Sequence, residues 1–188
     1  MIRSKKELKS ILSAEYDLYD KDYGFGSLLN RVKLFFVHDR RYAIWRFQKY
    51  MRYADYYKHT YEGMRILNIV LFLWYSRIRN SMGEHLGFDF FGYNLPVGLQ
   101  LYHANIVMNS RASIGMNLHL HGENVIGNNA KSSECPTIGN NVLMGAGAKV
   151  FGNVFIADDI KIGAGAIVVS SFMEKGITIG GIPARKIK

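Results

Sequence analysis

Residues 112–168 read ASIGMNLHLHGENVIGNNAKSSECPTIGNNVLMGAGAKVFGNVFIADDIKIGAGAIV, and an aliphatic side chain recurs at almost every sixth position. These positions are Ile114, Leu120, Ile126, Ser132, Ile138, Met144, Val150, Ile156, Ile162 and Val168. A second register, two residues earlier, holds mostly small or branched residues, and glycine often follows the aliphatic position directly. One short strand and one turn per repeat satisfy this pattern, because glycine relieves turns that need unusual φ and ψ. The repeat therefore predicts a mainly β fold, a left-handed parallel β-helix of triangular coils.

Two other architectures do not fit this spacing. A helix needs apolar residues at three- and four-residue intervals, and a β-sandwich places its turns every eight to twelve residues. The exception to the repeat, Ser132, lies in the polar stretch 128–136, which we expect to leave the coil as a loop. A solenoid wall is nearly featureless, so protruding loops of this kind supply specificity.

Composition indicates two parts in this chain of 188 residues. Residues 1–85 hold 16 Lys and Arg against 9 Asp and Glu, whereas residues 86–188 hold 8 against 6. Ten of the 12 tyrosines also lie in the first part. We predict a basic, aromatic-rich α-helical domain over residues 1–85 and a β-helix domain with a C-terminal tail over residues 86–188.

The first part has helical periodicity. Apolar residues recur at intervals of three or four from Ile44 to Ile78, with basic residues among them, which is typical of helices that bury one face. One interpretation is a helical cap that packs on the solenoid. Another adds contact with an anionic membrane surface, because basic and aromatic side chains together favour such an interface.

Several partners and locations receive little support. The apolar run from Ile66 to Tyr75 is about ten residues, against the roughly 20 needed to span a bilayer. No signal peptide opens the chain, so we expect a cytoplasmic protein, peripheral at the inner face of the cell membrane if the helices bind lipid. No zinc-finger or RNA-recognition motif indicates a nucleic acid partner.

The single cysteine, Cys135, excludes an internal disulfide and is best explained as a small loop residue.

Three histidines lie in or beside the repeat. His119 and His121 flank the inward position Leu120, so both side chains should point outward. His103 precedes His121 by three six-residue repeats. If coiling already includes residue 103, their imidazoles should stack on adjacent coils, about 4.8 Å apart. A surface or hydrogen-bonded histidine is the ordinary alternative for each alone.

Several motifs resemble those of hexapeptide-repeat acyltransferases of the serine acetyltransferase type. They are GLQLYHANIVMN at 98–109, IGNNVLMGAGAKV at 138–150, KIGAGA at 161–166 and GIPAR at 181–185. The resemblance covers about residues 86–187. The basic aromatic helices and the ECPTIG loop exit at 134–139 are most similar to bacterial capsule and exopolysaccharide O-acetyltransferases.

The resemblance implies roles for individual residues. It implies that His103 is the general base, oriented by Asp89, and that acetyl-CoA is the acyl donor, with no metal. The two Gly-Ala-Gly turns would present backbone groups to the pantetheine arm. The implied cofactor-binding residues are Ala146, Lys161, Ala164, Arg185 and Lys186, and the implied substrate-binding residues are Tyr102, Asn105, His121 and Glu123.

Two departures from the family pattern concern the acceptor. Serine acetyltransferases have an aspartate directly before the base histidine, where this chain has Tyr102. They also have an Arg-His pair in the loop, where this chain has Glu134 and Cys135. Because both amino-acid anchors are missing, we predict direct transfer of acetyl to a sugar hydroxyl in surface polysaccharide biosynthesis. Serine O-acetylation is the alternative.

The alignment with the family also lacks one residue after His103, and it places Gly122, rather than His121, at the family's next histidine. This shift leaves the geometry around His121 open. Members of the family close their sites between subunits, so the resemblance implies a homotrimer. Two rivals are a non-catalytic scaffold, which would not bind acetyl-CoA, and a gamma-type carbonic anhydrase, which would bind zinc through three histidines.

Overall fold

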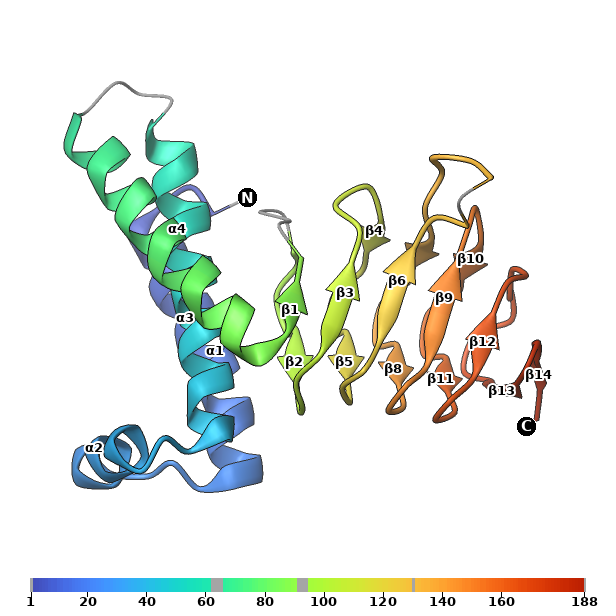
Figure 1. The fold of residues 1–188 in the computed structure, drawn as a ribbon, viewed down its shortest axis with the longest axis horizontal. Coiled ribbons are helices and arrows are strands. Elements are labelled where there is room, and N and C mark those ends of the chain that lie inside the picture. Colours follow the sequence, from blue (N-terminus) through green and yellow to red (C-terminus); the bar gives the residue numbers. More distant parts are fainter. Residues whose placement is uncertain (1, 62–65, 91–94, 130, 188) are drawn as a thin grey trace. The chain divides into compact units, whose positions relative to one another are not determined.

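The structure is a computed structural model that describes residues 2–61, 66–90, 95–129 and 131–187. The chain divides into two compact units, Met1–Leu86 and Gly87–Lys188. The first unit is helical and the second is built from short strands (Figure 1). The change of structure therefore falls next to the expected boundary between residues 85 and 86.

The helical unit contains α1 (Lys5–Tyr23), α2 (Leu28–Phe36), α3 (Arg40–Tyr61) and α4 (Ile66–Leu86). Ser4 begins α1, because its hydroxyl accepts a hydrogen bond from the backbone N–H of Glu7 at 3.1 Å. Gly24 ends α1 in a left-handed conformation, with φ of 62°. Among the helices that the structure describes, none combines the length and hydropathy needed to cross a lipid bilayer.

The expected apolar face is present on α3 but not on the first half of α4. Ile44, Phe47 and Met51 are buried, as predicted, whereas Leu67 is exposed. The interior of this unit is also more polar than the periodicity indicated. Glu15 and Arg52 form a buried ion pair, with Arg52 Nε 3.1 Å from Glu15 Oε2. Residue 64, part of the predicted apolar face, lies outside the described residues.

The second unit is the predicted left-handed parallel β-helix. Its strands are β1 (Phe88–Asp89), β2 (Gln100–Leu101), β3 (Ile106–Met108), β4 (Ser113–Ile114), β5 (His119–Leu120), β6 (Val125–Gly127), β7 (Thr137–Ile138), β8 (Leu143–Met144), β9 (Lys149–Phe151), β10 (Phe155–Ile156), β11 (Lys161–Ile162), β12 (Ile167–Val168), β13 (Thr178–Gly181) and β14 (Ala184–Lys186). They form a five-stranded sheet (β1-β3-β6-β9-β12), a three-stranded sheet (β10-β7-β4) and a six-stranded sheet (β14-β13-β11-β8-β5-β2). All pairs are parallel except β13 with β14.

The six-residue repeat corresponds to the buried positions of the coil. Leu120, Ile126, Met144, Val150 and Ile156 are all 0% exposed. Paired strands are usually three repeats apart, as Val150 and Val168 are, but Ile114 pairs with Ile138, four repeats later. One repeat has therefore left the coil, and the exposed Ser132 lies in it, as predicted for the loop 128–136.

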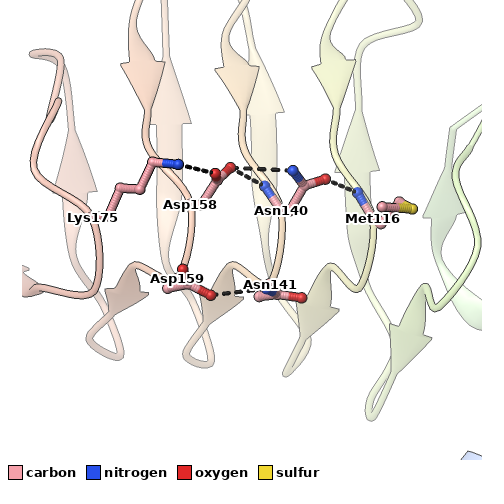
Figure 2. A network of polar contacts seen from close by, with 6 residues as sticks. All are labelled: Met116, Asn140, Asn141, Asp158, Asp159 and Lys175. Atoms are coloured by element: carbon pink, nitrogen blue, oxygen red, sulfur yellow. Dashed lines mark hydrogen bonds and ion pairs between the residues drawn. The ribbon is translucent and has the colours of Figure 1, made fainter.

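A ladder of polar side chains fixes the turns that lead into the six-stranded sheet (Figure 2). Asn140 bridges three coils, because its side-chain oxygen accepts from Met116 N at 2.9 Å and its backbone N–H donates to Asp158 at 2.8 Å. Asp158 also pairs with Lys175 at 2.6 Å. Beside it, Asn141 donates to Asp159 at 2.8 Å. These contacts satisfy turn groups that the strands leave unpaired, so this corner is structural.

Candidate functional site

His103 lies at a different corner, where the chain passes from the six-stranded sheet into the five-stranded sheet. It follows β2, and its side chain is exposed. Asn105, two residues later, has φ of 62°, a left-handed conformation that asparagine adopts more readily than most residues. Coiling therefore already includes residue 103, which was the condition for the predicted stacking of histidines.

Four turns stack on successive coils at this place, and we call residues 102–105, 121–124, 145–148 and 163–166 the histidine corner. Backbone hydrogen bonds join the turns: Glu123 N donates to Ala104 O at 3.0 Å, Gly147 N to Gly122 O at 2.9 Å, and Gly165 N to Ala146 O at 2.9 Å. The corner thus brings together seven of the predicted site residues, which are Tyr102, His103, Asn105, His121, Glu123, Ala146 and Ala164.

The predicted stacking of His103 on His121 is wrong. Val107 pairs with Val125, three repeats later, whereas Leu101 pairs with Leu120, which lies one residue beyond three repeats. The first turn is therefore one residue longer than the next one. As a result, the Tyr102 ring stacks on His121, with centroids 4.3 Å apart and planes at 18°.

The coil neighbour of His103 is instead Gly122. A Cβ atom added to Gly122 would lie 2.6 Å from the Cβ of His103, and Gly122 has φ of 98°. Only glycine combines that conformation with so close an approach. The absent side chain therefore lets the turn that carries His103 pack directly on the backbone of Gly122.

Tyr102 connects the other two histidines. Its hydroxyl lies 3.4 Å from Nδ1 of His119, while its ring covers His121. Burial lowers the pKa of His121 below its ordinary value, and the nearby His103 lowers that pKa further because two positive charges repel. His121 Nε2 is buried and has no hydrogen-bond partner in the part of the chain that the structure describes. His121 is therefore a neutral imidazole at neutral pH.

Asn105 and Glu123 lie at equivalent left-handed positions on adjacent coils, with φ of 62° and 56°. Both side chains are exposed. They supply an amide and a carboxylate beside the exposed imidazole of His103, in the region where the acceptor was expected.

The two Gly-Ala-Gly turns continue the same corner away from His103. Ala146 and Ala164 are exposed, and Gly147 and Gly165 have φ of 71° and 68°. At about 4.8 Å per coil, Ala146 lies about 10 Å and Ala164 about 14 Å along the corner from His103. Small residues make this part of the corner a narrow, open track.

The three predicted cationic residues lie on the six-stranded sheet. Lys161, on β11, is exposed, and β14 carries Arg185 and Lys186 at the end of the sheet. Lys186 Nζ pairs with Glu174 Oε1 at 2.6 Å. This ion pair was not predicted, and it makes Lys186 a weaker phosphate ligand than Lys161 or Arg185.

The structure does not bring Asp89 to His103. Asp89 is on β1, where it pairs with Val107 in the five-stranded sheet. It lines a hollow of about 460 Å³ that also includes Asn109, Asn128 and Phe151. Among the described residues, no hydrogen bond joins Asp89 to His103. Proximity along the sequence was insufficient to assign this pair, because the chain turns a corner between them.

Asn124 is a site residue that the sequence analysis missed. It is 0% exposed, although it occupies an inward register that is otherwise mostly apolar. Its side-chain oxygen accepts from Gly122 N at 2.9 Å, and its amide donates to Gly145 O at 2.8 Å and Ala148 O at 3.2 Å. Asn124 therefore stabilises the histidine corner from the interior of the coil. A polar residue in an otherwise apolar register was the sequence signal that could have identified it.

The loop residues Glu134 and Cys135 lie away from these contacts. Glu134 accepts a hydrogen bond from Asn153 at 3.0 Å, and Cys135 donates weakly to the backbone oxygen of Ser133 at 3.8 Å. Within the described ranges, no group of three or more His, Cys, Asp or Glu side chains is arranged to hold a metal ion. The geometry thus gives no specific support to the carbonic anhydrase alternative.

These features define a left-handed β-helix of hexapeptide repeats with an exposed histidine at one corner. No protein-family model matches the chain. It is 35% identical over 99 residues to serine acetyltransferases of Synechococcus elongatus and Helicobacter pylori. The match covers 51% of this chain in both cases, and 40% and 57% of the two relatives. The chain therefore spans about half the length of these curated relatives.

Solved serine acetyltransferases have a similar fold. One from Brucella abortus, determined in complex with coenzyme A, has a TM-score of 0.66 at 25% identity, covering 97% of this chain and 68% of that one. One from Neisseria gonorrhoeae has the same TM-score and identity, covering 98% and 67%. These relatives support the resemblance to the serine acetyltransferase type. The closer likeness to polysaccharide O-acetyltransferases stays a prediction.

Proposed function

We propose that this chain is an acetyl-CoA-dependent O-acetyltransferase with His103 as its general base. The observation that carries the proposal is the histidine corner, where an exposed imidazole begins a track of small residues about 14 Å long. A pantetheine arm is narrow and extended, so it fits such a track with its thioester at His103. The relative solved with coenzyme A supports the choice of donor.

The proposed reaction is direct transfer. His103 removes the proton of an acceptor hydroxyl as the oxygen attacks the thioester carbonyl carbon. The tetrahedral intermediate collapses, the C–S bond breaks, and the proton held by His103 passes to the leaving thiolate. General-base catalysis of this kind contributes about 10²- to 10⁴-fold.

The oxyanion of that intermediate needs a hydrogen-bond donor. The side-chain amide of Asn105 and the neutral imidazole of His121 each carry an N–H next to the proposed reaction centre. Loss of one such donor typically lowers kcat by about 10²- to 10³-fold. Asp89 has no part in this mechanism, because it lies on another sheet and does not contact His103.

Lys161 and Arg185 are the proposed partners of the coenzyme A phosphates. Both are exposed cations on the six-stranded sheet, and Lys161 lies on the same coil as Ala164. A guanidinium or ammonium binds phosphate through charge-assisted hydrogen bonds. Lys186 contributes less, because binding there competes with its ion pair to Glu174.

Serine is the acceptor that the comparisons favour over a sugar. The named relatives are serine acetyltransferases, and the Neisseria gonorrhoeae enzyme has also been solved with serine. Glu123 supplies a carboxylate for the serine ammonium in place of the aspartate expected at position 102. A sugar hydroxyl in polysaccharide biosynthesis is the second candidate, because the neutral Tyr102 ring offers a stacking surface and no charge to an amino acid.

Thiol release from acetyl-CoA, measured with L-serine and with sugar acceptors, tests both parts of the proposal. Saturable turnover with serine and a raised serine KM in Glu123→Gln are expected. Turnover with a sugar nucleotide or polysaccharide but not with serine would select the second candidate. A lack of thiol release with every acceptor, together with no acetyl-CoA binding by calorimetry, would favour a scaffold instead.

We also propose that the chain forms a homotrimer. A single β-helix offers flat faces and an open corner, so a neighbouring copy is needed to enclose the acceptor. Analytical ultracentrifugation should give three times the 21.4 kDa chain mass. A monomer that retains full activity would contradict this assembly.

A further inference from the structure

Helix α2 has its apolar side turned toward solvent. Leu28, Leu29, Val32, Phe35 and Phe36 are all exposed, with Leu29 at 81% and Phe36 at 73%. At 100° per residue these five positions form one continuous face. A helix of a globular protein normally directs such a face toward the core, and none of the residues of α2 is buried.

The opposite side of α2 is held to the helical unit by polar contacts. Asn30 donates from its amide to the backbone oxygens of Gly24 at 3.1 Å and Phe25 at 2.9 Å. The guanidinium of Arg31 lies 5.5 Å from the centroid of the Tyr16 ring. Ser27 caps the first turn through its hydroxyl. The outward direction of the apolar face is therefore fixed by specific contacts, and α2 projects at one end of the helical unit (Figure 1).

The segment that carries this face is basic. Residues 24–50 contain six basic side chains and one acidic side chain, a net charge of +5. Arg46 lies over the Phe35 ring, 4.5 Å from its centroid, and lines a hollow of about 840 Å³ together with Trp74, Arg77 and Glu84. Basic groups thus continue from the apolar face into a neighbouring groove.

We propose that α2 is an interfacial helix that docks on an anionic lipid bilayer. Its apolar face enters the boundary between headgroups and acyl chains, and the surrounding lysines and arginines bind lipid phosphates. A second copy of this chain is the less suitable occupant, because it would bring another set of positive charges to the same face. This proposal narrows the membrane contact expected of the N-terminal helices to α2.

Sedimentation of the full chain with vesicles tests this proposal. Vesicles of phosphatidylglycerol and phosphatidylcholine should bind the protein, and vesicles of phosphatidylcholine alone should bind it about tenfold more weakly. The double variant Leu29→Ser/Phe36→Ser should lose about tenfold or more in binding, because two side chains no longer enter the bilayer. Raising salt from 0.1 to 1 M should weaken binding, because the Debye length falls from about 10 Å to about 3 Å.

The matched control is Leu67→Ser/Val70→Ser, which changes two exposed apolar residues on α4. It should bind vesicles within about twofold of the wild type, and neither double variant should change the melting temperature. Absence of binding at low salt would overturn the proposal, as would binding that only the α4 variant loses. A fall in oligomer mass in the α2 variant would also overturn it and identify a second copy as the occupant.

Discussion

At the scale of single residues, the chemistry of the candidate site depends on a one-residue difference between two turns. The extra residue in the first turn puts Tyr102 on His121 and His103 against Gly122. Gly122 lets the backbone at His103 pack closely, while the His103 side chain stays exposed. His121, in contrast, is covered and kept neutral.

Replacing the base tests that assignment most directly. His103→Ala should reduce acetyl transfer by about 10²- to 10⁴-fold. The melting temperature should stay unchanged, because the side chain is exposed. His85→Ala, which removes an exposed histidine on α4, is the control and should keep full activity. Equal turnover of the two variants would remove His103 from the mechanism.

Gly122→Ala tests the close packing of His103 on Gly122. The new methyl group would meet His103 Cβ at 2.6 Å, so the imidazole must move and turnover should fall by about tenfold or more. The control is Gly176→Ala, where φ is 73° and a Cβ meets nothing within 4 Å. That change should cost about 1 kcal/mol of stability from backbone strain alone and leave turnover intact.

The pKa of His121 predicts how stability responds to acid. Its folded pKa lies below the ordinary 6.5, so the unfolded chain takes up this proton first as pH falls. The contribution of His121 to stability is therefore present above about pH 6.5 and is lost progressively below it. His121→Phe keeps the stack on Tyr102 but cannot titrate. Urea unfolding at pH 7.5 and 5.5 should show a smaller acid-induced loss in this variant, and an identical loss would contradict the prediction.

At the scale of elements, the two kinds of corner have different supports. The corner in Figure 2 is held by half-buried and exposed side chains that bridge coils, whereas the histidine corner is held by the buried Asn124. Hydrogen bonds in a buried position are costly to leave unmade, since no water replaces the lost partner. The geometry around His103 therefore depends on an interior amide more than on surface contacts.

Asn124→Leu should destabilise the chain by about 2 kcal/mol or more, because it leaves the N–H of Gly122 without its partner and removes one of two hydrogen bonds to each of Gly145 O and Ala148 O. The control Asn117→Gly removes an exposed 2.8 Å bond to Asn141 at a position with φ of 55°. It should cost less than about 1 kcal/mol, because water replaces the bond and glycine tolerates that φ. Similar losses of unfolding free energy in the two variants, measured by chemical denaturation, would show that Asn124 does not stabilise the corner more than Asn117 does.

At the scale of the whole molecule, the two units are stabilised by different means. Aliphatic side chains on successive coils fill the β-helix, whereas the helical unit buries an ion pair between Glu15 and Arg52. A buried charge is tolerated only while its partner is present. A single substitution in this ion pair should therefore destabilise the helical unit selectively.

Glu15→Gln removes the carboxylate that pairs with the buried guanidinium of Arg52. Loss of one partner of such a pair typically costs about 3–5 kcal/mol, so the helical signal in circular dichroism should be lost at a lower temperature. Asp17→Asn, two residues away and exposed, is the control and should have little effect. Equal melting of the two variants would mean that the buried pair contributes nothing.

The sequence by itself determined the β-helix, the loop 128–136 and the change of structure near residue 86. These features follow from local periodicity, since a coil of fixed length repeats the same inward positions. The tertiary structure alone decided that Tyr102, rather than His103, stacks on His121, that Asp89 lies on another sheet, and that α2 turns its apolar face outward. Each of these depends on pairing register or on long-range contacts. One extra residue in a turn leaves the later hydrophobic repeat unchanged, yet it changes which side chains are neighbours at that corner.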